Sequence, residues 1–175
     1  MDSLPTLIAR HPFWQGAPPE QLAQLAAFAT LEHYGVGDLI FQERHPATHL
    51  YLIQHGHVAL EAFLPGTGVT TIVVLGPGEA LGWSWLFEPY QWQYSARSVD
   101  VTEIIAFDAG RLRALVERDP AFGRDLITRT ARLLEQRLLA ERFKLQELQA
   151  AQTPRLDEVL AEPEEDPEPF VAPRT

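Results

Sequence analysis

Short apolar segments separated by glycines fill the middle of this sequence and constrain its fold more than any other feature. Five of them, each rich in β-branched and aromatic residues, lie within about residues 31–108: DLIFQ, HLYLIQ, HVALEAFL, VTTIVVL and VTEIIAF. Such segments at near-regular intervals, with no helical pattern between them, predict an antiparallel roll or barrel. The string LPGTGV predicts the tip of a hairpin, because Pro65, Gly66 and Gly68 accept turn conformations that other residues resist.

Helical patterns flank this region on both sides. Residues 1–30 form a predicted helical lead-in, in which Pro19 begins a helix and leucines recur at helical spacing. Residues 109–152 are predicted to hold two helices, a short one that ends at Asp119 and a long one that begins at Pro120. Residues 153–175 are acidic and rich in proline, so we expect a disordered tail. The predicted fold class is mainly β with flanking helices.

The long helix carries an apolar stripe that extends beyond what a small roll can cover. Its members include Ile127, Leu134, Leu138 and Leu145. We interpret the stripe as a coiled-coil-like contact with a second copy, which predicts a homodimer. The alternative is that the helix packs back onto its own roll.

Composition excludes several classes of protein. The chain has no cysteine, so it has no disulfide and no thiolate zinc site. A net charge of −10 argues against binding to nucleic-acid phosphates, and the residues after Pro154 are too few for a helix-turn-helix domain. The N-terminus does not have the pattern of a signal peptide, and no segment is long enough to cross a membrane. We therefore expect a cytoplasmic protein that contacts neither DNA nor membrane.

Three strings together resemble the cyclic-nucleotide-binding domain family, best known from the Crp/Fnr regulators. YGVGDLIFQERHPATHLYLIQHGHVAL resembles the opening strands of that family, GEALGWSWLF its phosphate-binding cassette, and ARSVDVTEIIAF the strand after it. The resemblance covers residues 8 to about 148 and includes short bacterial members without a helix-turn-helix. It implies a double-stranded β-helix, or jelly-roll-like β-roll, with N-terminal helices and a long C-terminal helix.

Residues 78–87, hereafter the cassette, are the candidate ligand site. Backbone N–H groups at a glycine-rich turn that opens a helix can hold an anion such as a cyclic phosphate. In the family, a glutamate directly after a glycine accepts the ribose hydroxyl, and an arginine about ten residues later binds the phosphate. If Gly78 and Glu79 form this pair, then Glu79 is the ribose ligand, but the next arginine, Arg97, lies much too far along the sequence.

A second alignment, anchored on Leu86-Phe87, is preferred because both glycines then match. Gly82 becomes the cassette glycine, Trp83 stands in place of the glutamate, and Trp92 or Gln93 stands in place of the arginine. The resemblance then implies that both nucleotide-holding side chains are missing. We expect that the protein does not bind cyclic AMP or cyclic GMP in the usual way. A cyclic-nucleotide binder with an atypical cassette is retained as an alternative.

Aromatic residues are concentrated in and just after the cassette. They are Trp83, Trp85, Tyr90, Trp92 and Tyr94. They could line a pocket for another planar or apolar ligand. Alternatively, they could fill the space that a nucleotide occupies in the family and exclude water from it, or they could form an exposed face that binds another protein. Ser84, Ser95 and Arg97 are further candidate anion contacts.

The remaining histidines and the search for catalytic motifs predict neither a metal site nor an active site. His55 and His57 could share one face of a strand, and His45 and His49 form a second pair, but the sequence offers no third ligand. It also contains no nucleophile elbow and no P-loop. The sequence thus predicts a non-enzymatic regulatory or sensor module without a cofactor. The alternative is a protein–protein interaction module with a tryptophan-filled pocket.

Overall fold

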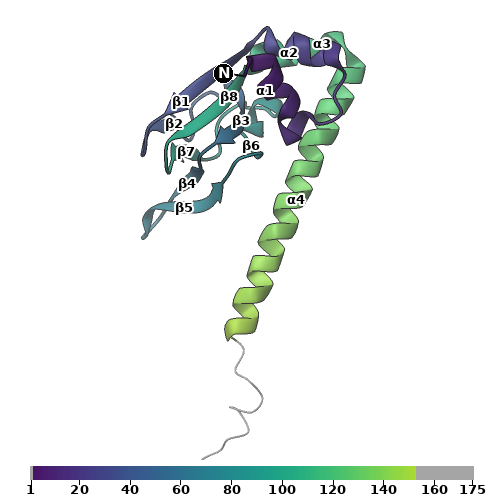
Figure 1. Cartoon of the computed structure of the whole chain (residues 1–175). Helices are drawn as coiled ribbons and strands as arrows, with labels where there is room; N and C mark the ends of the chain where they lie inside the picture. The colour runs from purple at the N-terminus through teal and green to yellow at the C-terminus, as the bar shows by residue number, and fades with distance from the viewer. Residues whose placement is uncertain (1, 153–175) are drawn as a thin grey trace, which may run out of the picture. The chain divides into compact units, whose positions relative to one another are not determined.

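Two antiparallel four-stranded sheets form the core of the protein (Figure 1). The computed structural model describes residues 2–152. At residues 140–141, 143–145 and 147–152 it describes the backbone alone. The first sheet has the order β1-β8-β3-β6 and the second has the order β2-β7-β4-β5. The strands are β1 (Ala29–Tyr34), β2 (Leu39–Phe41), β3 (His49–His55), β4 (Val58–Leu64), β5 (Gly68–Leu75), β6 (Ala80–Leu81), β7 (Ser95–Ser98) and β8 (Thr102–Asp108).

The predicted fold class, a mainly β roll with flanking helices, is confirmed. The five apolar segments became β2, β3, β4, β5 and β8, and their alternating side chains fill the space between the sheets. Strand β7 falls within the string ARSVDVTEIIAF, which the resemblance assigned to a strand, whereas β1 and β6 were not predicted. Strand β1 begins at Ala29, inside the range assigned to the helical lead-in, and β6 has two residues.

The predicted hairpin joins β4 to β5, with Leu64 paired to Gly68. Gly66 and Gly68 adopt φ angles of +85° and +84°, which the turn requires. Towards the core, Val58 and Leu60 are buried, whereas Phe63 and Leu64 near the tip are exposed. The hairpin therefore extends beyond the hydrophobic core.

Three helical segments precede the roll: α1 (Leu4–Arg10), the short 3-10 helix η1 (Pro12–Trp14) and α2 (Pro19–Ala26). His11 joins this lead-in to the first sheet from a buried position. Its Nδ1 accepts the N–H of Phe13 at 3.2 Å, so its Nε2 carries the proton and donates to the carbonyl of Ile53 on β3 at 3.2 Å. Burial lowers the pKa of His11 to about 4.

Two helices follow the roll, α3 (Ala109–Arg118) and α4 (Pro120–Gln152). Asp119 separates them and caps the start of α4, where its carboxylate accepts the N–H groups of Ala121 and Phe122. Arg129 donates to the carbonyls of Phe13 and Gln15 and thus fixes the first part of α4 to η1. Residues up to Leu133 form one compact unit, and the second begins at Leu134.

The expected disorder of residues 153–175 concerns a part of the chain outside the described residues. Among residues 2–152, no helix is both long and apolar enough to span a lipid bilayer.

We expect His11 to make stability depend on pH. Its pKa is about 4 in the folded protein and 6.5 in the unfolded chain, so between these values the unfolded chain binds more protons. The free energy of unfolding should therefore fall by about 3 kcal/mol as the pH drops from the unfolded to the folded pKa. His11→Asn, which keeps an acceptor for Phe13 but does not titrate, should lack this component. Denaturant unfolding at several pH values measures it, and the exposed His45→Asn serves as the control. Parallel pH profiles for His11→Asn and wild type would contradict the assignment.

Candidate functional site

The cassette turns sharply at Gly82, directly after the short strand β6. Gly82 has a φ of +88°, and a 3-10 helix, η2 (Trp83–Leu86), begins immediately after it. A Cβ atom at Gly82 would lie 3.0 Å from the ring of Trp92 and 3.1 Å from the carbonyl oxygen of His49. Both the backbone conformation and the close packing therefore require glycine at this position.

Trp92 is the residue against which Gly82 packs. Its indole is only 3% exposed and stacks on Phe41 of β2, with ring centres 4.0 Å apart and planes 17° from parallel. On another side, the ring of Tyr51 on β3 lies 6.1 Å away. Because Phe41 and Tyr51 belong to different sheets, the indole bridges the two sheets in front of the cassette.

Hydrogen bonds at both the N–H and the carbonyl of Trp92 hold its backbone in this position. Its N–H donates to the carbonyl of His45, and its carbonyl accepts the N–H of Arg44, each at 2.9 Å. Arg44 and Tyr90 both have positive φ angles, 67° and 53°, which are uncommon for residues other than glycine. The paired segments around residues 44–47 and 90–92 thus form a rigid support for the indole.

The cavity left beside the cassette measures about 20 Å³, which is room for about one water molecule. Five of the predicted site residues line it: Gly82, Trp83, Ser84, Trp92 and Gln93. Phe41, Leu60 and Tyr94 complete the lining. Sequence reasoning missed Phe41 as a site residue. Its position in an apolar strand predicted burial, but the sequence does not show which ring it would meet.

Gly78 and Glu79, the pair in the first alignment, do not line this cavity. Glu79 Oε2 accepts the N–H of Gly76 at 2.8 Å, so its carboxylate closes the turn that it belongs to. The N–H of Gly78 donates to the carbonyl of Ile53 on β3, and the carbonyl of Glu79 accepts the N–H of the same residue. These hydrogen bonds therefore hold the start of the cassette against β3.

Trp85 and Arg97 also do not line this cavity. Trp85 is fully buried within η2, and its carbonyl accepts a hydrogen bond at 3.1 Å from Nη1 of Arg113 on α3. The guanidinium of Arg113 also lies over the ring of Tyr90, 4.8 Å from its centre. Arg97 lies on β7 between the buried Ala96 and Ser98, and its side chain donates to Glu61 and to the carbonyl of Gly37. Arg97 is therefore not directed toward the cassette.

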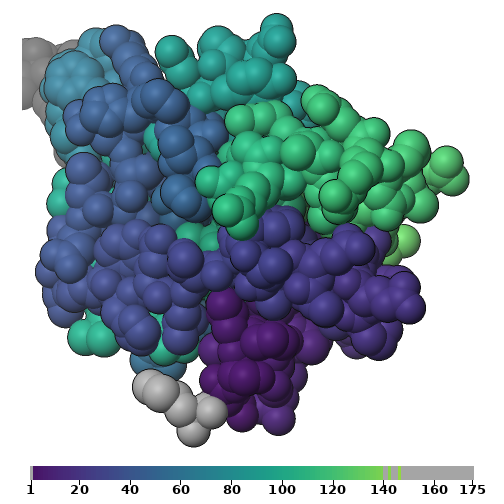
Figure 2. Space-filling model, turned by 90° about the horizontal axis from the view of Figure 1, so that it is seen from above, coloured from purple at the N-terminus to yellow at the C-terminus, as the bar shows by residue number. Residues whose placement is uncertain are grey.

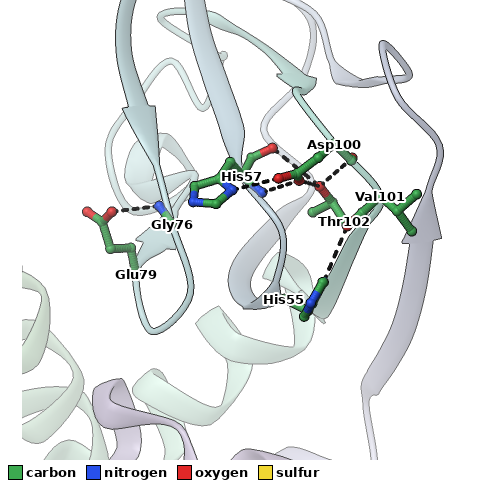
Figure 3. A network of polar contacts seen from close by, with 7 residues as sticks. All are labelled: His55, His57, Gly76, Glu79, Asp100, Val101 and Thr102. Carbon is green, nitrogen blue, oxygen red and sulfur yellow. Dashed lines mark hydrogen bonds and ion pairs between the residues drawn. The ribbon is translucent and has the colours of Figure 1, made fainter.

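The histidines of the β3–β4 turn have structural partners (Figure 3). Both the N–H and Nδ1 of His57 lie 2.7 Å from carboxylate oxygens of Asp100, and the side-chain hydrogen bond from His57 lowers the pKa of Asp100. Between the two histidines, Gly56 has a φ of +80°, and a Cβ there would lie 2.5 Å from the carbonyl oxygen of Val101. Among the histidine and acidic side chains that the structure describes, no group of three or more could hold a metal ion.

An antiparallel β-roll with a glycine turn and a short helix between β6 and β7 defines a class of regulatory ligand-binding domains. A family model described as "Cyclic nucleotide-binding domain" matches residues 31–119, and the chain belongs to this family.

Known relatives agree with this assignment. A CRP-like cAMP-activated global transcriptional regulator of Mycobacterium tuberculosis is 25% identical over 128 residues, which are 73% of this chain and 57% of the relative. The cyclic AMP receptor protein of Thermus thermophilus is 30% identical over 125 residues, 71% of this chain and 58% of the relative. The N-terminal domain of a transcriptional regulator from Streptomyces coelicolor superposes with a TM-score of 0.61 and 26% identity, covering 77% of this chain and 94% of that one. The chain thus spans less than two thirds of the length of the two curated relatives.

Removing the Trp92 side chain should open the cavity. We expect Trp92→Ala to lower the free energy of unfolding by about 3–5 kcal/mol, because a large buried ring is lost without full collapse of the site. Free indole should then raise the Tm of this variant, since apolar cavities of this kind bind aromatic molecules. Trp83→Ala, at a half-buried position, should lose less stability and gain none from indole. Trp92→Leu gives a smaller cavity if the alanine variant does not fold, and an indole-insensitive Tm in both would contradict the packing described.

Proposed function

We propose that the protein is a non-enzymatic regulatory module of the cyclic nucleotide-binding domain family that does not bind cyclic AMP or cyclic GMP in the usual way. The observation that carries this proposal is the position of Trp92. Its indole packs beneath Gly82, where it leaves a cavity of about 20 Å³. Pockets for small organic ligands measure about 300 Å³ or more.

The charge of the site supports the same conclusion. A cyclic phosphodiester carries a negative charge, and burying it requires a cationic or strongly hydrogen-bonding partner. The described residues that line the cavity include no arginine, lysine or carboxylate. The nearest arginine along the chain, Arg97, is already bonded to Glu61 and to the Gly37 carbonyl. A nucleotide would have to displace a buried stacked indole and would find no cation in its place.

The closed cassette also favours an interaction module over a sensor of another small ligand. An aromatic-walled pocket would need open space between the rings, whereas the rings of Trp92 and Phe41 are in stacking contact. A module with a filled pocket acts through its surfaces. We therefore propose that this protein works through contacts with other polypeptides, and that it does not itself bind DNA, consistent with its net charge of −10.

One such contact is a second copy of the chain through α4. Ile127 and Leu138 are 55% and 72% exposed, and Leu134 is half-buried on the same helix. The side chain of Leu145, the fourth predicted member, lies outside the described residues. Ile127, Leu134 and Leu138 lie at intervals of seven and four residues, and such apolar spacing along a helix is typical of one that pairs with another helix.

Titration calorimetry tests the nucleotide proposal directly. We expect no measurable heat from cyclic AMP or cyclic GMP at concentrations up to the millimolar range. The Thermus thermophilus cyclic AMP receptor protein serves as the comparison under identical conditions. Saturable binding in the low-micromolar range would refute the proposal and would establish an atypical cyclic-nucleotide binder.

The dimer is tested by substitution on α4. Leu138→Glu places a charge in the proposed interface and should weaken the dimer by about ten-fold or more. Gln136→Glu adds the same charge at an exposed polar position of α4 and should have little effect. Sedimentation equilibrium over a range of concentrations measures both. A wild-type chain that is monomeric throughout, or an equal response to the two substitutions, would exclude this interface.

A further inference from the structure

A groove runs between the end of α2, the start of β1 and the outer side of α3, and is hereafter the α2–α3 groove. Two adjoining hollows of about 340 and 310 Å³ form it, and they share Ala27, Phe28 and Arg111. Figure 2 shows this face, where the indigo surface of α2 borders the green surface of α3. The groove offers more than ten times the volume of the cavity at the cassette.

The floor of the groove is apolar. Leu115 of α3 is almost fully buried, Phe28 is half-buried, and the methyl groups of Ala27 and Ala114 are exposed beside them. Small side chains at Ala27 and Ala114 keep the floor open. A space of this size accommodates one or two aliphatic side chains of a partner, and its apolar floor favours their burial.

The rim of the groove is positive. Arg111 and Arg118 both line it, and they lie seven residues apart on α3, which places them about two turns apart on one side of the helix. Both are exposed, and among the side chains that the structure describes neither forms an ion pair, whereas Arg97 and Arg129 do. Arg111 reaches across the groove to the carbonyl of Ala27, with Nη1 at 3.4 Å.

One carboxylate at the groove offsets part of the charge of this rim. Asp108 lines the second hollow, and its Oδ1 accepts the N–H of Arg111 as the N-cap of α3. The residues that line the two hollows include two arginines and one carboxylate, so the groove keeps an excess of positive charge in a protein whose net charge is −10. Such a site attracts acidic groups that the rest of the surface repels.

We propose that the α2–α3 groove binds an acidic segment of a partner protein that also carries leucine or a similar aliphatic side chain. Carboxylates of that segment pair with Arg111 and Arg118, and its aliphatic side chains cover Phe28 and Leu115. A second copy of this chain is disfavoured, because a two-fold contact across the groove would bring the same arginines together. Nucleic acid is disfavoured because its phosphates could pair with the arginines of the rim but would not bury the apolar floor of the groove. The inference rests on the groove alone and is independent of whether the cassette binds a nucleotide.

The test is a titration of the full-length, isotope-labelled chain with synthetic peptides, followed by NMR. The probe is a short peptide of repeated EELL, and the controls are KKLL, which reverses the charge, and EESS, which removes the aliphatic side chains. We expect EELL to shift the amide signals of Ala27, Phe28 and Ala114, and to bind more weakly as salt is raised. KKLL should not bind, and EESS should bind at least five-fold more weakly.

Charge reversal locates the site on the protein. Arg111→Glu and Arg118→Glu should each weaken EELL binding by about five-fold or more, and Ala114→Glu, which fills the floor, should do the same. Arg124→Glu is the matched control, because Arg124 is an exposed arginine on α4 that does not line the groove. The proposal is overturned if EELL does not bind, if KKLL binds equally well, or if Arg124→Glu weakens binding as much as Arg111→Glu. It is also overturned if Arg111→Glu dissociates a dimer of the chain, because the occupant would then be a second copy.

Discussion

The stacking of Trp92 on Phe41 is the contact on which the arrangement of this domain depends. Phe41 belongs to one sheet and Tyr51 to the other, their rings lie 5.6 Å apart, and the indole packs against both where the two sheets approach the cassette. Gly82 must lack a side chain for this to happen, since its Cβ would stand 3.0 Å from the ring. One buried indole thus determines the backbone of the cassette, the spacing of the sheets and the volume left for a ligand.

Family membership and ligand binding are separate properties of this fold. The short helix is anchored in the hydrophobic core, in which Trp85 of η2 is fully buried. Trp92, one of the two residues that the second alignment sets in the position of the family's arginine, is itself part of that core. The relatives that match this chain therefore support the architecture more firmly than they support any one ligand.

Much of the fold could be predicted from the sequence, because alternation and glycine spacing are strong local signals. Strand β1 was not predicted, since the run Ala26-Ala27-Phe28-Ala29 continues the helical composition of α2, and β6 is too short to show a period. At the site, Gly82, Trp83 and Trp92, all predicted site residues, line one cavity. The directions of Trp85 and Arg97 could not be predicted, because they depend on the turn of η2 and on the register of β7 against β4.

Helix α3 makes contacts on two sides. Arg113 extends from it to the Trp85 carbonyl and the Tyr90 ring, next to the aromatic residues of the cassette. From the same ten residues, Arg111 and Arg118 extend to the opposite neighbour, α2. Because α3 carries both sets of contacts, a partner that holds Arg111 and Arg118 would also restrain the helix that Arg113 attaches to the cassette.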